Sequence, residues 1–202
     1  LNNYFHRYYL RTIYPIINIQ GEYGYYEVGN KQEPYGKVLL MVKQSVPVFS
    51  GKLKYLIESG YVFGDVPFPL LEYPRVTRGI WFPEYDFCLM NQMEFMTDAY
   101  IMGNFRYITS GWIFNYIPWV KKANLREEVL FKIAYGGLRN GHNNILELPV
   151  NSAGIDVPYM EAGIGISNIL KLFSVQSVWR LTHRDAPNAI NWGIRFRFNL
   201  DF

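Results

Sequence analysis

The end of the chain, residues 192–202, alternates strictly between bulky apolar side chains and polar or small ones. The apolar positions are Trp192, Ile194, Phe196, Phe198, Leu200 and Phe202, and Gly193, Arg195, Arg197, Asn199 and Asp201 lie between them. A period of two is the spacing of side chains on one face of a β-strand. The segment therefore predicts a strand with one apolar face and one face that carries charge.

The same alternation recurs along most of the chain. It is clear in six further segments and weaker in three: 17–25, 53–61, 99–107, 128–135, 160–167 and 173–182, then 37–47, 91–96 and 112–116. Together with the last strand this makes about ten strands, and no segment has the spacing of a convincing amphipathic helix. We predict an all-β fold with antiparallel strands.

Composition favours a transmembrane β-barrel over a soluble sheet. Aromatic residues make up 18% of the chain and charged residues also 18%, whereas ~25% charged residues is typical of soluble domains. No apolar run reaches the ~18 residues of a transmembrane helix. Charges nevertheless stand within the predicted strands, as a wet lumen requires: Glu22, Glu58, Glu94, Glu128, Lys132, Glu161, Arg180 and Arg195. A soluble β-sandwich also alternates and remains the alternative fold.

The predicted connections form a long set and a short set. The long set is 27–35, 64–87, 109–111, 138–157 and 184–191, and the short set is 50–52, 97–98, 117–124 and 167–172. Outer-membrane barrels have long extracellular loops and short periplasmic turns, and only 109–111 departs from this pattern. With Phe202 at the periplasmic rim, we expect an integral outer-membrane protein in contact with lipid, including the outer lipopolysaccharide leaflet.

The polar face of the strands should point into the lumen of such a barrel, and the apolar set that begins at Trp192 should face lipid or a partner barrel. The candidate lumen charges are Glu94, Glu128, Glu161, Arg180, Arg195 and Arg197. Opposite charges on neighbouring strands come within reach of one another. At least one of the three arginines is therefore expected to contact Glu128 or Glu161.

Residues 64–87 form a predicted loop that is rich in proline and aromatic residues. Proline removes ladder donors, and a free loop of this composition would expose a large apolar surface to water. We predict that the loop packs over or into the barrel mouth. Arg78 should then point at a lumen carboxylate such as Glu94.

Patterns that carry enzyme chemistry are absent from the sequence. His6, His142 and His183 are far apart, without Glu or Cys at metal-binding spacing. The single cysteine, Cys88, excludes an internal disulfide and is expected to be a buried or lipid-facing small residue. We therefore expect no catalytic residue, no cofactor and no metal. The net charge of +3 is too small to indicate a nucleic-acid partner.

Several stretches make the chain similar to a known family along nearly its whole length. They are Gly163-Ile164-Gly165-Ile166-Ser167-Asn168-Ile169, Val178-Trp179-Arg180-Leu181-Thr182-His183, Asn188, Gly193-Ile194-Arg195, and residues 60–71, 91–98 and 115–127. The family resembled is a group of large Bacteroidota outer-membrane proteins with an N-terminal carboxypeptidase-regulatory-like domain and a C-terminal barrel. The chain starts at Leu1, so residues 1–202 are expected to be the C-terminal part of one barrel domain, without that N-terminal domain and the first strands.

The last three strands more distantly resemble the end of a BamA-like barrel. The resemblance implies about the last ten of about sixteen strands, a role in outer-membrane protein assembly or translocation, and outer-membrane or periplasmic protein partners. BamA-like barrels carry a Val-Arg-Gly-Phe-type motif on an inward loop, and the nearest match here is Val76-Thr77-Arg78-Gly79-Ile80, one hairpin earlier. A porin-like or transporter barrel, or a membrane anchor for a periplasmic domain, are the alternative functions.

The resemblance also assigns a role to the apolar set at the C-terminus. Trp192, Ile194, Phe196, Phe198, Leu200 and Phe202 look like the insertion signal of outer-membrane barrels. The alternative is that Phe202 only holds the strand at the membrane interface, where aromatic residues settle.

Overall fold

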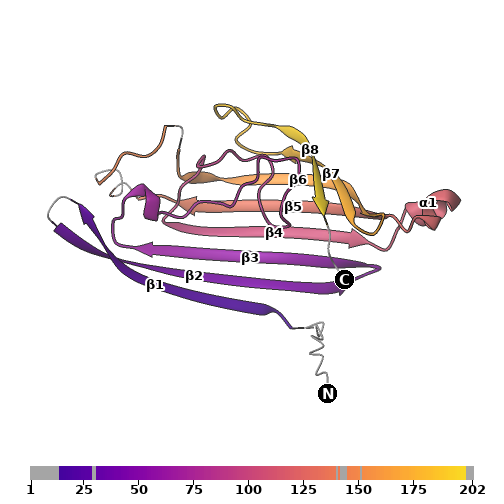
Figure 1. The fold of residues 1–202 in the computed structure, drawn as a ribbon, viewed down its shortest axis with the longest axis horizontal. Helices are drawn as coiled ribbons and strands as arrows, with labels where there is room; N and C mark the ends of the chain where they lie inside the picture. Colours follow the sequence, from indigo (N-terminus) through magenta and orange to yellow (C-terminus); the bar gives the residue numbers. More distant parts are fainter. Residues whose placement is uncertain (1–13, 29–30, 140, 142–144, 151, 199–202) are drawn as a thin grey trace, which may run out of the picture.

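The structure is a computed structural model that describes residues 14–28, 31–139, 141, 145–150 and 152–198. Within these residues, eight strands form one sheet in which each strand pairs antiparallel with the next along the chain (Figure 1). They are β1 Ile16–Val28, β2 Lys31–Val48, β3 Gly51–Phe63, β4 Ala99–Thr109, β5 Arg126–Gly137, β6 Ile155–Ile169, β7 Phe173–Arg180 and β8 Trp192–Phe198. The predicted all-β, antiparallel fold is confirmed.

Helical structure is confined to three short segments in the connections. These are η1 Phe68–Leu70, η2 Phe114–Tyr116 and α1 Pro118–Lys122. Across the described ranges, no helix has the length and apolar character needed to cross a membrane.

Strand β5 shows how the alternating sequence becomes two different faces of the sheet. Val129 and Phe131 are exposed, whereas Glu128, Leu130 and Lys132 are buried. Successive side chains of a strand point to opposite faces, so the charged residues share one side. We call the side that carries Glu128 and Lys132 the inner face of the sheet, and the opposite side the outer face.

The predicted strand at residues 91–96 is wrong, because this segment is a turn. Met93 has a positive φ of 57°, a conformation that ends the pleat of a strand. The backbone N–H of Asn91 donates to the Glu94 carboxylate at 2.8 Å. A side chain thus takes the backbone donor that a neighbouring strand would otherwise have paired.

The predicted strand at residues 112–116 is also wrong. Its backbone N–H groups at Trp112, Ile113 and Phe114 donate to the carboxylate of Glu127. Because one carboxylate satisfies three successive donors, the segment curls into η2 instead of extending.

The connections lie at two ends of the sheet. We call them the loop end, with residues 64–98, 138–154 and 181–191, and the turn end, with residues 49–50, 110–125 and 170–172. The expected exception at 109–111 disappears, since β4 continues to Thr109 and the chain then turns through 110–125. The predicted loop at 27–35 is wrong, because β1 and β2 pair as far as Val28 and Lys31.

The sheet is strongly curved, and β7 and β8 turn over its inner face (Figure 1). Residues 64–98, which we call the inner loop, run across this face. In the part of the chain that the structure describes, β1 and β8 are the two edges and do not pair with each other. The described strands therefore form an open, curved sheet.

Candidate functional site

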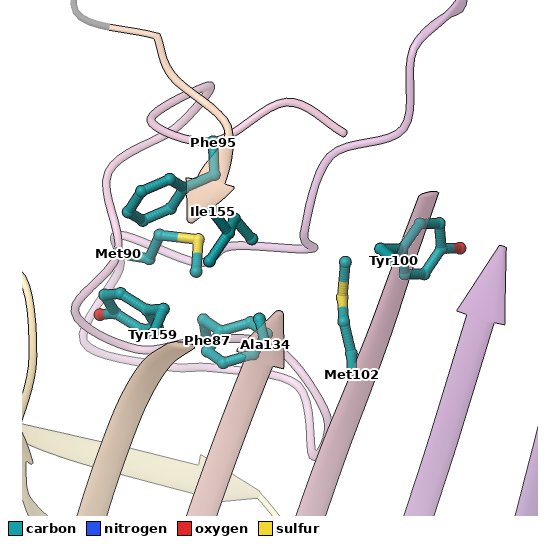
Figure 2. Close-up of a cluster of buried hydrophobic side chains, with 8 residues drawn as sticks. All are labelled: Phe87, Met90, Phe95, Tyr100, Met102, Ala134, Ile155 and Tyr159. Atoms are coloured by element: carbon teal, nitrogen blue, oxygen red, sulfur yellow. The ribbon is translucent and has the colours of Figure 1, made fainter. Parts of the chain in front are cut away.

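The inner loop is seated on the inner face partly by apolar packing. Figure 2 shows Phe87, Met90 and Phe95 of the loop lying over side chains of β4, β5 and β6. The sheet contributes Tyr100, Met102, Ala134, Ile155 and Tyr159. The rings of Phe87 and Tyr159 meet edge to face with centroids 5.6 Å apart, a favourable aromatic geometry.

Glu161 of β6 binds the middle of the inner loop directly. Its carboxylate accepts hydrogen bonds from the backbone N–H groups of Cys88 at 2.9 Å and Leu89 at 2.7 Å. The Tyr159 hydroxyl donates to the same carboxylate at 2.7 Å. Glu161 has no exposed surface, so these three donors replace the water that a buried carboxylate needs.

Two cations complete the contact with the same loop backbone. The guanidinium of Arg195 donates to the Cys88 carbonyl at 2.7 and 3.2 Å. The ammonium of Lys132 donates to the Asp86 carbonyl. Charged side chains from β5, β6 and β8 thus hold residues 86–89 mainly through backbone atoms, and Lys132 also lies 3.4 Å from the Cys88 Sγ.

Cys88 is 1% exposed and free, as predicted for a buried small residue. Burial raises the pKa of its thiol, although the ammonium of Lys132 opposes the shift. The thiol therefore stays protonated at neutral pH, which disfavours a nucleophilic role.

A buried ion pair holds the next part of the loop. Arg180 of β7 donates to both carboxylate oxygens of Glu94, with Nη1 3.1 Å from Oε2. Glu94 therefore carries one of the predicted inward charges, but from the loop and not from a strand. The expected partner was wrong: Arg78 donates to the Asn91 side chain at 2.8 Å instead, because Arg180 already occupies Glu94.

A second charged cluster lies between the loop and the first half of the sheet. Glu128 accepts ion pairs from Arg106 at 3.0 Å and Arg197 at 3.2 Å. Glu84 of the loop lies 3.3 Å from Lys54 and 3.4 Å from Arg106. The expected contact between an inward arginine and Glu128 or Glu161 is present in the pair of Arg197 with Glu128.

This cluster leaves little free space. The cavity beside Lys54, Glu84 and Arg106 measures about 10 Å³, roughly the space of one water molecule. Burial alone would raise the pKa of Glu84, but the positive charges of Arg106 and Lys54 lower it below its usual value. Glu84 is therefore ionised at neutral pH and attracts the cations of the sheet.

The inner loop also pairs with the edge of β8. The backbone N–H of Phe196 donates to Ile80 at 2.8 Å, and the N–H of Phe82 donates to Phe196 at 3.1 Å. Arg78 and Gly79, the candidate inward motif, lie just before this bridge and are exposed. Residues 64–87 pack against the inner face of the sheet, and the packed segment continues through residue 98; that this face is the mouth of a barrel stays a prediction.

The apolar positions of β8 lie on the outer face. Trp192, Ile194 and Phe198 are exposed, and Phe196 is half-buried beneath Trp81. Leu200 and Phe202 of the predicted insertion signal lie outside the described residues. His6 and His142 also lie outside the described residues. The ring of His183 meets the ring of Phe95 edge to face and stacks on the ring of Tyr159.

Sequence reasoning missed that the loop backbone is the partner of the inner charges. The repeated charges on the inner face signalled a polar surface, but the sequence carries no mark of which backbone carbonyls or N–H groups they meet. Among the described residues, no group of His, Cys, Asp and Glu is arranged to hold a metal ion. The charged side chains of the sheet hold the inner loop in place through hydrogen bonds and ion pairs.

The first two thirds of the chain match a known protein family. A family model described as "Family of unknown function (DUF5686) C-terminal domain" matches residues 2–143. The matched part includes β1 to β5 and the whole inner loop. No curated protein and no solved structure shows a significant match to the chain.

Proposed function

The chain belongs to the DUF5686 family, whose C-terminal domain has unknown function, and from this premise we propose that it is part of an integral outer-membrane β-barrel. Within that proposal, its role is in outer-membrane protein assembly or translocation, as a BamA-like barrel or an accessory subunit. Outer-membrane lipid and other outer-membrane or periplasmic proteins are the partners that this role requires.

The proposal rests on the polarity of the two faces of the sheet, which is opposite to that of a water-soluble sheet. Lys132, Glu161 and Arg180 are at most 2% exposed on the inner face, whereas Ile19 is 72% and Ile164 59% exposed. In a water-soluble antiparallel sheet the apolar face forms the core and the polar face meets solvent. An apolar exterior around a charged interior is instead the pattern of a barrel in lipid.

The strands in the middle of the sheet are long enough to cross a bilayer. β3, β4 and β5 contain 13, 11 and 12 residues, and a tilted transmembrane strand needs about 9–11. In lipid an unpaired strand edge is costly, so the proposed barrel needs further strands to pair with the edge of β1.

The occupied inner face favours an assembly or translocation role over a porin. A porin has a water-filled lumen. Beside β3 to β5 the loop and the ion pairs of Glu84 and Glu128 leave a cavity of only about 10 Å³, whereas the space beside Glu22 and Lys37 of β1 and β2 measures about 520 Å³. The Arg78-Gly79 pair is exposed and lies one hairpin earlier than the inward motif of BamA-like barrels, so it does not add to this proposal.

Arginine substitutions test whether the outer face meets lipid. Ile164→Arg on the outer face of β6 should lower the stability of the full-length protein in vesicles by about 2–4 kcal/mol. Leu146→Arg is the matched control, because Leu146 is an exposed aliphatic residue in the loop-end connection 138–154. The proposal would be contradicted if the two variants were equally stable in vesicles. It would also be contradicted if the wild type stayed in the aqueous fraction of a membrane flotation experiment and did not float with the vesicles.

Two measurements separate the assembly role from a porin. The full-length protein in a planar bilayer should conduct little current, and its depletion from cells should lower the folded amount of other outer-membrane proteins. Large, steady conductance with unchanged levels of other barrels would favour the porin-like function instead.

A further inference from the structure

The turn end of the sheet is positively charged on its surface. Five exposed basic residues lie in or beside its three connections: Lys52, Lys121, Lys122, Arg126 and Lys171. Within residues 49–52, 110–127 and 168–172, the acidic residue is Glu127, and its carboxylate is already bound by the backbone N–H groups of η2. Within these described ranges, no second carboxylate offsets the charge of the five cations.

The loop end carries charges of both signs. Its connections and adjoining strand ends carry six exposed acidic residues, Glu27, Glu33, Asp65, Glu147, Asp156 and Asp185. The same end also carries four exposed arginines, Arg75, Arg78, Arg139 and Arg184, so among the described connections an excess of positive charge is found at the turn end.

Large apolar side chains accompany the cations at the turn end. The most exposed are Phe49 at 94%, Tyr116 at 87%, Leu170 at 79%, Ile113 at 65% and Trp112 at 51%. In Figure 1, α1 projects from this end beyond the strands. Apolar groups and cations therefore share one surface that is continuous with the outer face of the strands.

Side-chain contacts join the three connections into one built surface. Trp112 of the β4–β5 connection donates from its indole nitrogen to Ser50 in the β2–β3 turn. Asn168 beside the β6–β7 turn donates to the Asn124 carbonyl at 2.7 Å. The rings and cations are thus held in place relative to one another, and do not depend on a bound partner for their positions.

We propose that the turn end is an interfacial site for anionic phospholipid head groups, with Lys121 and Lys122 at its centre. This inference rests on the proposed membrane function. Amphipathic aromatic residues settle at the boundary between lipid and water, and clustered basic side chains beside them attract an anionic membrane surface. An acidic protein partner would meet the cations but would not account for aliphatic residues that continue the lipid-facing side of the strands.

The test compares vesicles that differ only in head-group charge. Full-length protein is inserted into phosphatidylcholine vesicles with or without phosphatidylglycerol, and the folding equilibrium is measured by urea unfolding. The wild type should gain about tenfold in this equilibrium constant from phosphatidylglycerol. The doubly substituted Lys121→Gln/Lys122→Gln protein should lose most of this gain, and added salt should reduce the gain of the wild type.

Arg184→Glu is the matched control, since Arg184 is an exposed basic residue at the loop end. It should keep the gain from phosphatidylglycerol. Insertion of the wild type with the same stability in both kinds of vesicle would overturn this inference and leave the proposed function standing, as would an equal loss in the control variant. Failure of the wild type to insert into either kind of vesicle would overturn the proposed function and this inference with it.

Discussion

The Glu161 carboxylate on β6 lies 2.7 Å from the backbone nitrogen of Leu89, 72 residues earlier in the chain. This hydrogen bond joins the middle of the inner loop to the middle of the sheet. Because Glu161 is fully buried, losing its loop donors would leave a carboxylate without solvation. The inner charges and the loop therefore stabilise each other.

Glu161→Gln should loosen the inner loop. The amide oxygen can still accept hydrogen bonds, but the NH₂ group replaces the other carboxylate oxygen and then faces the N–H of Cys88 or that of Leu89, which bind different oxygens; a buried unsatisfied donor costs about 1–3 kcal/mol. We expect trypsin to cleave at Arg75 or Arg78 faster than in the wild type. The exposed loop substitution Glu147→Gln is the control and should not change the cleavage rate. Cleavage of all three proteins at one rate would show that Glu161 does not hold the loop.

The pair of Arg180 and Glu94 should behave as a coupled unit. Removing one partner of a buried ion pair costs about 3–5 kcal/mol, since the other charge is left buried alone. We expect Arg180→Met and Glu94→Gln each to lower the free energy of unfolding, and the double variant to cost clearly less than the sum. A double-mutant cycle on unfolding in detergent measures this coupling. Additive effects would mean that the two side chains do not interact.

Acid should weaken the binding of the inner loop to the sheet, because it protonates Glu84. The pKa of Glu84 is lowered in the folded protein, so its stabilising contribution is present above the unfolded pKa of about 4.3 and is lost as the pH falls through the lower folded pKa. The difference in unfolding free energy between wild type and Glu84→Gln should therefore shrink between pH 5 and the acid limit, about pH 2. Glu147→Gln serves as the control, and an unchanged wild-type advantage at the acid limit would contradict the role of Glu84.

Gly165 should not tolerate a side chain. A Cβ there would lie 2.5 Å from the Val175 carbonyl oxygen on the paired strand β7, too close for a backbone atom to give way cheaply. We expect Gly165→Ala to destabilise the protein by about 1–3 kcal/mol. Gly137→Ala is the matched control, because nothing lies within 4 Å of the corresponding position in β5. Thermal unfolding of the two variants measures the difference, and equal midpoints would rule out the clash.

The structure also changes what is expected of two neighbouring residues of β8. The sequence alone predicts that Phe196→Arg impairs folding far more than Arg197→Phe, because only the first places charge in lipid. Arg197, however, lies 3.2 Å from the buried Glu128. Arg197→Phe leaves that carboxylate with one arginine fewer, so both substitutions are now expected to be damaging, and for different reasons.

The sequence by itself determined most of the strands and, within those strands, the side of the sheet on which each residue lies. The alternation at Glu128, Val129 and Leu130 predicted which side chains share a face, because successive residues of any strand point to opposite sides. This rule is local, so it needs no knowledge of neighbours. The alternation rule failed at 91–96 and 112–116. There the carboxylates of Glu94 and Glu127 accept hydrogen bonds from backbone N–H groups, and the chain turns instead of forming a strand.

Only the tertiary structure decided which groups the inner charges meet. The alternation placed Arg180 on the polar side, but its partner Glu94 comes from a loop 86 residues earlier, and Glu161 is bound by backbone groups that no side-chain pattern marks. Buried charge takes whichever donors and acceptors the folded chain brings within reach, because leaving it unpaired costs several kcal/mol. That choice depends on the path of the inner loop, and the path is settled by packing of the whole loop against the curved sheet.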